Sequence, residues 1–209
     1  MDADEYHCIE GDILREIGLI KHVQLQRSSL KQGQRPQRYY DPTPLLLVKR
    51  LRLAPGGVSA VGADGVSIID IHHADHPETK NSLGKNGISI GFTSHYGAMR
   101  DRYGAHLTDG CAGENILVES ELVWSLDDLG AAIVIERADG QRVTLDGVIV
   151  ALPCVEFSRF THLSADPLTA EQLRTTLQFL DGGMRGFYAR LAAGQGDVEI
   201  CAGDRVLIP

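Results

Sequence analysis

Short runs of β-branched and apolar residues, each bounded by glycine, proline or aspartate, recur along almost the whole chain. β-Branched side chains favour extended backbone, and the bounding residues favour tight turns. Many short strands separated by such turns are typical of a sandwich or a barrel. The sequence therefore predicts a mainly β fold, with strands over residues 17–27, 45–53, 66–71, 115–118, 131–136, 141–145, 148–152, 197–201 and 205–208.

Two Asp-Gly pairs mark the clearest chain reversals. The first ends at Gly140 and is expected to join strands 131–136 and 141–145 in a hairpin, because these residues readily take the positive φ angles of tight turns. The second ends at Gly147 and is expected to send residues 148–152 back into the sheet.

Helical signals are fewer. Residues 170–181 form the best candidate helix, since Thr169 can cap its first turn together with Gln172, and leucines recur on one face. Glycines from Gly182 onward suit its carboxyl end. A weaker helix is expected over residues 95–103.

Size and charge narrow the class of protein. A chain of 209 residues suits one domain, expected over residues 15–209 after an N-terminal extension of residues 1–14. The formal net charge of −8 opposes nucleic-acid binding, which depends on lysine and arginine neutralising phosphates. The chain has no apolar run long enough to span a bilayer, no secretory signal and no CxxC pair among its four cysteines. We therefore expect a cytoplasmic protein with reduced thiols. Membrane and nucleic-acid partners are not expected.

One cysteine has a distinctive setting. Pro153 and Cys154 follow the apolar run 148–152 directly, so the sulfur is expected at the exit of a buried strand. Rigid backbone and access to solvent are what a reactive or metal-binding thiolate needs. Free cysteine is also among the most buried residue types, so a simple packing role is the alternative.

Other polar residues raise further candidate chemistries. His72, His73 and His76 form the densest histidine cluster, which suggests a metal-dependent hydrolase as one alternative, although no HExxH spacing is present. Otherwise one of the first two histidines is expected to line a pocket. Ser89 stands in a formal GxSxG match, but the strand and helix alternation of a serine hydrolase is missing.

A polar strand entry precedes the apolar residues 116–118. It consists of Gly113, Glu114 and Asn115, with Cys111 shortly before it. These residues suit either a turn that starts a strand or a ligand site in which the glutamate orients the ligand.

Several short motifs along the chain are unspecific one by one, but their order and spacing together are informative. They are His95, Tyr96, Arg100, Tyr103 and Gly104; Gly113, Glu114, Asn115 and Ile116; residues 126–129; Pro153 and Cys154; Gly186, Phe187 and Tyr188; and Gly203, Asp204, Arg205 and Val206. In this order the chain resembles the MOSC domain, the module found at the C-terminus of molybdenum cofactor sulfurases and in free-standing bacterial proteins. The similarity covers roughly Gly18 to Pro209.

The resemblance implies a closed β-barrel of the pyruvate kinase type with a few short peripheral helices. It also implies that Cys154 carries sulfur as a persulfide, taken from a pyridoxal phosphate-dependent cysteine desulfurase, or is a thiolate ligand of the molybdenum atom. The implied activity is sulfur transfer or molybdenum-dependent reduction of N-hydroxylated compounds, the latter with a separate redox partner. A sulfurtransferase and an oxidoreductase are therefore both expected possibilities.

The implied cofactor is a phosphorylated pterin, which needs cations and hydrogen-bonding groups around it. The residues expected to bind it or a small-molecule substrate are Gly113, Glu114, Asn115, Arg100, Arg159, Arg35, Arg38 and His73. A binding protein on the same barrel, without turnover and with Cys154 only packing or anchoring, is the main alternative.

Overall fold

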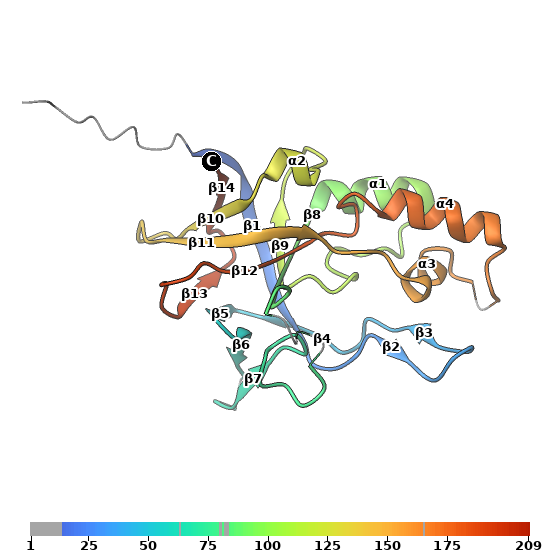
Figure 1. The fold of residues 1–209 in the computed structure, drawn as a ribbon, viewed down its shortest axis with the longest axis horizontal. Coiled ribbons are helices and arrows are strands. Elements are labelled where there is room, and N and C mark those ends of the chain that lie inside the picture. The colour runs from blue at the N-terminus through green and yellow to red at the C-terminus, as the bar shows by residue number, and fades with distance from the viewer. Residues whose placement is uncertain (1–13, 63, 80, 82–83, 165) are drawn as a thin grey trace, which may run out of the picture.

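A computed structural model describes residues 14–62, 64–79, 81, 84–164 and 166–209. Seven strands form a closed β-barrel, in the order β14, β10, β11, β12, β8, β9 and β1, with β1 pairing back to β14 (Figure 1). All neighbours are antiparallel except β8 and β9, which are parallel. The bounds are β1 (Arg15–Gln26), β8 (Ile88–Phe92), β9 (Ile116–Glu119), β10 (Ala132–Glu136), β11 (Arg142–Val150), β12 (Phe187–Leu191) and β14 (Arg205–Ile208).

Smaller sheets extend the barrel. The long strand β1 also pairs with β4 (Leu45–Val48), and β2 (Lys31–Gln32) pairs with β3 (Tyr39–Tyr40) in a short ribbon. A four-stranded sheet in the order β13, β5, β6 and β7 lies beneath the barrel in Figure 1. Its bounds are β5 (Arg50–Ala54), β6 (Gly57–Val61), β7 (Ser67–Ile69) and β13 (Val198–Cys201).

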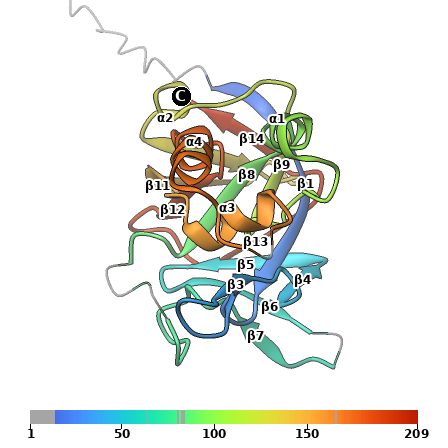
Figure 2. The same cartoon turned by 90° about the vertical axis from the view of Figure 1, so that its right-hand side faces the viewer.

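Three of the four helices in the described part of the chain gather on one side of the barrel, as Figures 1 and 2 show. They are α1 (Thr93–Tyr103), α3 (Val155–Thr161) and α4 (Ala170–Leu180), whereas α2 (Leu126–Leu129) is a single turn between β9 and β10. Helix α3 contacts both α4 and β3. The helices thus cover the barrel next to the ribbon of β2 and β3.

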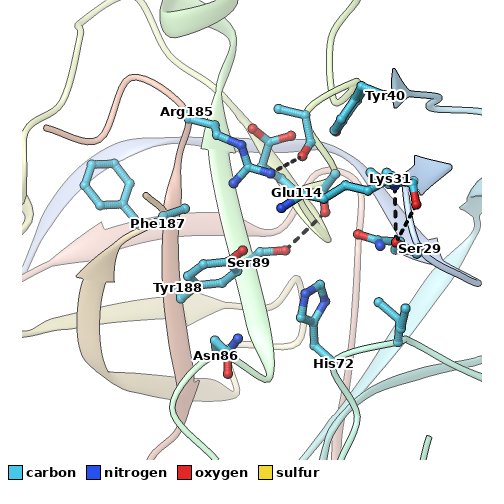
Figure 3. A pocket seen from close by; sticks show the side chains of 16 residues that line it. Ser29, Lys31, Tyr40, His72, Asn86, Ser89, Glu114, Arg185, Phe187 and Tyr188 are labelled. Carbon is cyan, nitrogen blue, oxygen red and sulfur yellow. Dashed lines mark hydrogen bonds between the residues drawn. The ribbon is translucent and has the colours of Figure 1, made fainter. Parts of the chain in front are cut away.

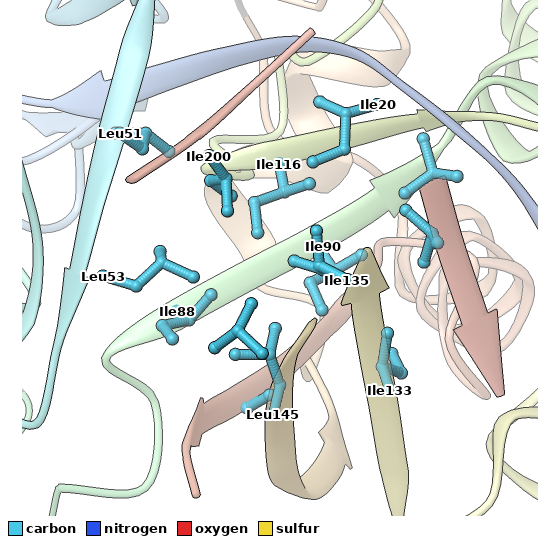
Figure 4. Packing of buried hydrophobic residues seen from close by; sticks show 14 of the residues in the cluster. Ile20, Leu51, Leu53, Ile88, Ile90, Ile116, Ile133, Ile135, Leu145 and Ile200 are labelled. Carbon is cyan, nitrogen blue, oxygen red and sulfur yellow. The ribbon is translucent and has the colours of Figure 1, made fainter. Parts of the chain in front are cut away.

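The main core fills the barrel with β-branched and leucine side chains, which interdigitate in Figure 4. All five residues of β8 are buried, because this strand lies between β12 and β9 in the ring and helix α1 continues from its end. A second cluster fills the space under the helices with Tyr96, Met99, Phe157 and Leu180, and the half-buried Cys154 packs against it.

Several expectations are confirmed. The structure is mainly β and closes into a barrel. Strands β10 and β11 form the hairpin expected at Gly140, and α4 carries a capping box in which Thr169 and Gln172 cap each other's backbone N–H groups. Helix α1 begins at Thr93, two residues before its expected start.

Two expectations about strands are wrong. The predicted strand 45–53 is interrupted at Lys49, so that β4 pairs with β1 and β5 joins the separate sheet. The predicted reversal at Gly147 is instead a bulge within β11, where the register against β12 shifts between Asp146 and Ile149. Gly147 has a φ of 63°, which bends the strand without turning it back.

The sequence-based assignment also missed strand β8. All five of its residues are buried, and a run this short cannot be distinguished by its periodicity from other buried segments. The expected N-terminal extension, apart from Leu14, and Cys8 lie outside the described residues. None of the helices described here is both long and apolar enough to cross a bilayer.

His95 joins α1 to the loop before α2. Its side chain is buried, and its Nε2 atom accepts a hydrogen bond of 2.9 Å from the backbone N–H of Trp124. Burial lowers the pKa of His95 to about 4. A protonated ring would lose this acceptor, so the fold requires neutral imidazole at this position.

We therefore expect acid to destabilise the protein through His95. The unfolded chain binds a proton on this residue below about pH 6.5, whereas the folded protein does not until about pH 4, so stability falls as the pH drops through this window. Between about pH 7 and pH 5 the contribution is about 2 kcal/mol. Urea unfolding of wild type and His95→Gln at both pH values measures this contribution, with His106→Gln as the control. An equal pH dependence of stability in wild type and His95→Gln would contradict the role given to His95.

Candidate functional site

A cavity of about 200 Å³ opens between the barrel and the ribbon of β2 and β3. Polar side chains from four different parts of the chain converge on it, as Figure 3 shows. They include Lys31 from β2, Ser89 from β8, Arg185 from the turn before β12, and His72 from the loop after β7. The cavity is therefore a polar site assembled by the tertiary fold.

The floor of the cavity is held by Asn115, whose side chain is fully hydrogen-bonded. Its Oδ1 accepts from the backbone N–H of Ser89 at 3.0 Å and from the Ser89 hydroxyl at 2.8 Å. Its Nδ2 donates to the backbone oxygen of Gln24 at 3.2 Å and to Asp70 at 2.8 Å. One buried carboxamide thus connects β8, β1 and the loop after β7.

Asp70 continues this network towards His72. The carboxylate is completely buried, and its Oδ2 accepts a backbone hydrogen bond of 2.6 Å from Gln26 in addition to the one from Asn115. Its Oδ1 accepts from the backbone N–H of His72 at 2.8 Å and contacts Nδ1 of the same histidine at 2.9 Å. Asp70 therefore fixes both the backbone and the ring of His72.

Glu114 forms the upper wall of the cavity. Its Oε2 accepts a hydrogen bond of 2.6 Å from the hydroxyl of Tyr96. Gly91 and Gly186 leave room for its side chain, because a Cβ atom on either would lie 2.8 Å or 3.3 Å from the glutamate Cγ. Burial raises the pKa of Glu114, although the Tyr96 hydrogen bond and the charge of Arg185 oppose the shift.

Arg185 is the most unusual residue of the site. Its guanidinium donates one hydrogen bond of 3.1 Å to the backbone oxygen of Ala112 and lies over the ring of Phe157. The Nε–H group is buried without a hydrogen-bond acceptor among the described residues, and none of their carboxylates forms an ion pair with this guanidinium. Despite burial, the neighbouring Tyr188, Tyr40, Cys154 and Glu114 raise the pKa of Arg185, so a positive charge faces the cavity.

Cys154 lies just behind the cavity wall. It is the N-cap residue of α3, half-buried, and follows the strand β11 by four residues. The lining of the cavity includes Ala151 but not Cys154. A negative charge on this sulfur raises the pKa values of Tyr40 and Arg185, which both line the cavity, so the sulfur lies close to them. The thiol is neither sealed in the core nor in direct contact with the cavity.

A second, shallower groove of about 540 Å³ adjoins this region. It shares Tyr40 with the cavity, and it is lined by Arg38, Arg159 and Glu156. Arg38 forms an ion pair with Glu156 there, and Arg159 donates a hydrogen bond to the backbone oxygen of Pro36 at 3.4 Å. These two expected cofactor residues therefore meet at a groove next to the cavity.

Of the eight expected cofactor residues, three belong to the cavity region: Gly113 and Glu114 line it, and Asn115 supports its floor. Arg100 is held by Asp109 at 2.6 Å and lies outside the cavity lining, and Arg35 is exposed. The sequence predicts that either His72 or His73 lines a pocket, and His73 is among the expected cofactor residues. In the structure His72 lines the cavity and His73 does not. The ring of His73 instead packs against Gly56.

Among the residues that the structure describes, the other cysteines and the histidines of the 72–76 loop do not form a second cluster of reactive groups. Burial, together with the charge of Glu114, raises the pKa of Cys111 well above its usual range and so keeps it a thiol, and the pKa of Cys201 is raised as well. The described residues include no group of three or more His, Cys, Asp or Glu side chains placed to hold a metal ion, and His72, His73 and His76 face different neighbours.

The sequence patterns did not indicate Arg185 as a site residue, and they indicated Ser89 only as part of a hydrolase motif. Arg185 carries no local signal, since it is one of 20 lysines and arginines and stands in an ordinary turn. Ser89 stood out only through a hydrolase motif that does not apply here. Its hydroxyl donates to Asn115 and accepts from the backbone N–H of the same residue at 2.9 Å, so it is a structural partner of that carboxamide.

Comparison with known proteins supports the fold. No protein-family model matches the sequence, and no curated protein matches it. The structure is similar to that of the YUAD protein from Bacillus subtilis, with a TM-score of 0.57 and 14% identity over 94% of this chain and 98% of that one. It is also similar to a hypothetical protein of known structure, with a TM-score of 0.52 and 10% identity over 92% of this chain and 67% of that one. The barrel is therefore a fold that other proteins share.

We expect Asn115→Ala to destabilise the protein by about 2–4 kcal/mol, because it leaves the Ser89 N–H and the Gln24 carbonyl buried without their partner. Denaturant unfolding followed by circular dichroism measures the change. Asn86→Ala, at the half-buried mouth of the same cavity, is the matched control, with an expected change within about 0.5 kcal/mol. Equal losses in the two variants would show that the Asn115 network contributes nothing special.

Proposed function

We propose that this chain is a MOSC-like barrel protein that binds a molybdenum–pterin cofactor, carries sulfur on Cys154, or does both. The observation that carries the proposal is the half-buried Arg185 at a polar cavity, whose Nε–H group is buried without an acceptor among the described residues. A buried N–H group without an acceptor is costly, and an anionic ligand that accepts from it removes that cost. The half-buried sulfur of Cys154 lies near this same cation.

The residues present fit such a cofactor in outline. A cavity of about 200 Å³ is smaller than the usual pocket for a large ligand, so it suits one anionic end or a small anion. The groove with Arg38 and Arg159 supplies further cations, and Tyr40 lines both spaces. A ligand that reaches from the cavity to the groove passes Tyr40, close to Cys154.

In this proposal Arg185 and Lys31 hold the anionic group, and Ser89, through Asn115, keeps the floor of the cavity rigid. The thiolate of Cys154 acts as a soft ligand or as a sulfur carrier. When bound, a molybdenum cofactor supplies two-electron redox chemistry. A separate electron donor or a cysteine desulfurase is then the expected partner, and a small N-hydroxylated compound or sulfur itself is the substrate.

A second candidate function rests on one specific observation. Because Cys154 does not line the cavity, the barrel also suits a protein that binds a small anion without turnover, in which this cysteine only packs against the helix cluster. The two functions differ in one respect: only the first requires the sulfur of Cys154.

We expect protein produced in a host that makes the molybdenum cofactor to contain bound molybdenum and pterin. Elemental analysis and the fluorescence of oxidised pterin measure both. Cys154→Ser is expected to lose most of the molybdenum, whereas Cys201→Ser, which alters another half-buried cysteine far from the cavity, keeps the wild-type content. Arg185→Lys is expected to reduce both contents while keeping a charge in place.

Sulfur carriage has its own test. During incubation with a cysteine desulfurase and cysteine, the terminal sulfur of the desulfurase persulfide passes to the Cys154 thiolate. One S–S bond breaks as another forms, and the desulfurase thiolate leaves. Mass spectrometry is expected to show one added sulfur on wild type and Cys201→Ser but none on Cys154→Ser. Absence of molybdenum, pterin and added sulfur from wild type would contradict the proposal.

A further inference from the structure

We infer that His72 is a protonation-dependent anion-binding residue, so that the cavity holds a small oxyanion more tightly when this histidine is charged. The inference rests on the proposed function only in placing an anionic group in the cavity. From the sequence alone, His72 was a candidate only for a metal site or for the lining of an unspecified pocket.

The first step is the orientation of the ring. Asp70 accepts every hydrogen bond that reaches its carboxylate, from Gln26, Asn115 and His72. A carboxylate in this role makes Nδ1 of His72 the donor of their contact at 2.9 Å. The other ring nitrogen, Nε2, is then free to accept or to donate a hydrogen bond on the opposite side of the ring.

The second step is the direction in which that nitrogen faces. His72 lines the cavity, and Figure 3 shows its ring directed towards Ser89 and the side chain of Lys31. The ring of Tyr188 lies beside it, with the centroids 6.0 Å apart. Protonation of Nε2 therefore adds a donor and a positive charge to the space that Lys31 and Arg185 already face.

The third step is the charge balance around the ring. The other titratable side chains lining the cavity in the described structure are Lys31, Tyr40, Glu114, Arg185 and Tyr188. Two of them are cations, and they oppose a charge on His72 while the cavity is empty of anions. The buried Asp70 and a bound oxyanion both favour that charge. Binding of an anion and protonation of His72 are thus coupled, and each strengthens the other.

Free histidine changes its charge between about pH 5 and pH 8, and this range is therefore the one over which the coupling is tested. Glu114 also lines the cavity and has the same sign of effect, because burial raises its pKa and its ionised form repels anions. The experiment must therefore separate these two residues.

Sulfate is the probe, because its own charge does not change over this range. In calorimetric titrations of the full chain from about pH 5.5 to pH 8, we expect the affinity for sulfate to fall by about tenfold as the pH rises. In His72→Gln the affinity is expected to be low and nearly independent of pH. His76→Gln, which changes a histidine of the same loop outside the cavity, is expected to behave as wild type.

A second measurement does not depend on a folded variant. In ¹⁵N NMR spectra of the histidine rings, we expect His72 to carry its proton on Nδ1 at high pH. We also expect sulfate to raise the pH at which the ring titrates. Reciprocity requires this shift whenever protonation strengthens binding.

Three results would overturn the inference. They are undetectable sulfate binding at the lowest pH, a pH dependence that persists in His72→Gln and so belongs to Glu114, or a ring protonated on Nε2 at high pH. The molybdenum and pterin measurements are separate. Loss of those with retained, pH-dependent sulfate binding would reject the proposed cofactor and leave the role of His72 standing.

Discussion

The buried carboxamide of Asn115 is the interaction on which the site depends. Strands β8 and β9 are the parallel neighbours of the barrel, and Asn115, at the entry to β9, uses its side chain to join them to β1 and to Asp70. A single polar side chain with all its hydrogen bonds made specifies one arrangement of these segments, since any displacement leaves buried groups unpaired. Asp70 transmits this order to His72, and the cavity floor is rigid as a result.

Charge in a confined space determines what such a cavity favours. Arg185 is half-buried, its Nε–H group has no acceptor among the described residues, and burial shifts Glu114 towards its neutral form. The region is therefore positive although the whole chain carries a formal net charge of −8. Local geometry, and not net charge, decides the sign of the charge here, because short-range interactions in a partly dry site exceed those with distant surface charges.

Local signals explain which parts of the fold were predictable. The hairpin at Gly140 and the capped helix α4 depend on residues within a few positions of one another, and both are confirmed. The pairing of β1 with β14, by contrast, joins the two ends of the described chain, and no local pattern encodes it. The same applies to the cations: Arg38 pairs with Glu156, which lies 118 residues further along the sequence, and this ion pair holds Arg38 at the neighbouring groove.

The sequence by itself determined the strand-rich class, the polar entry with Glu114 and Asn115, and the position of Cys154 beyond a strand end, because these follow from residue type and short-range order. Only the tertiary structure decided that His72 rather than His73 faces the cavity, that Ser89 supports Asn115, and that Arg185 brings a positive charge to the cavity lining. The physical reason is that burial, hydrogen-bond satisfaction and charge proximity are properties of the closed barrel, which brings together residues far apart along the chain.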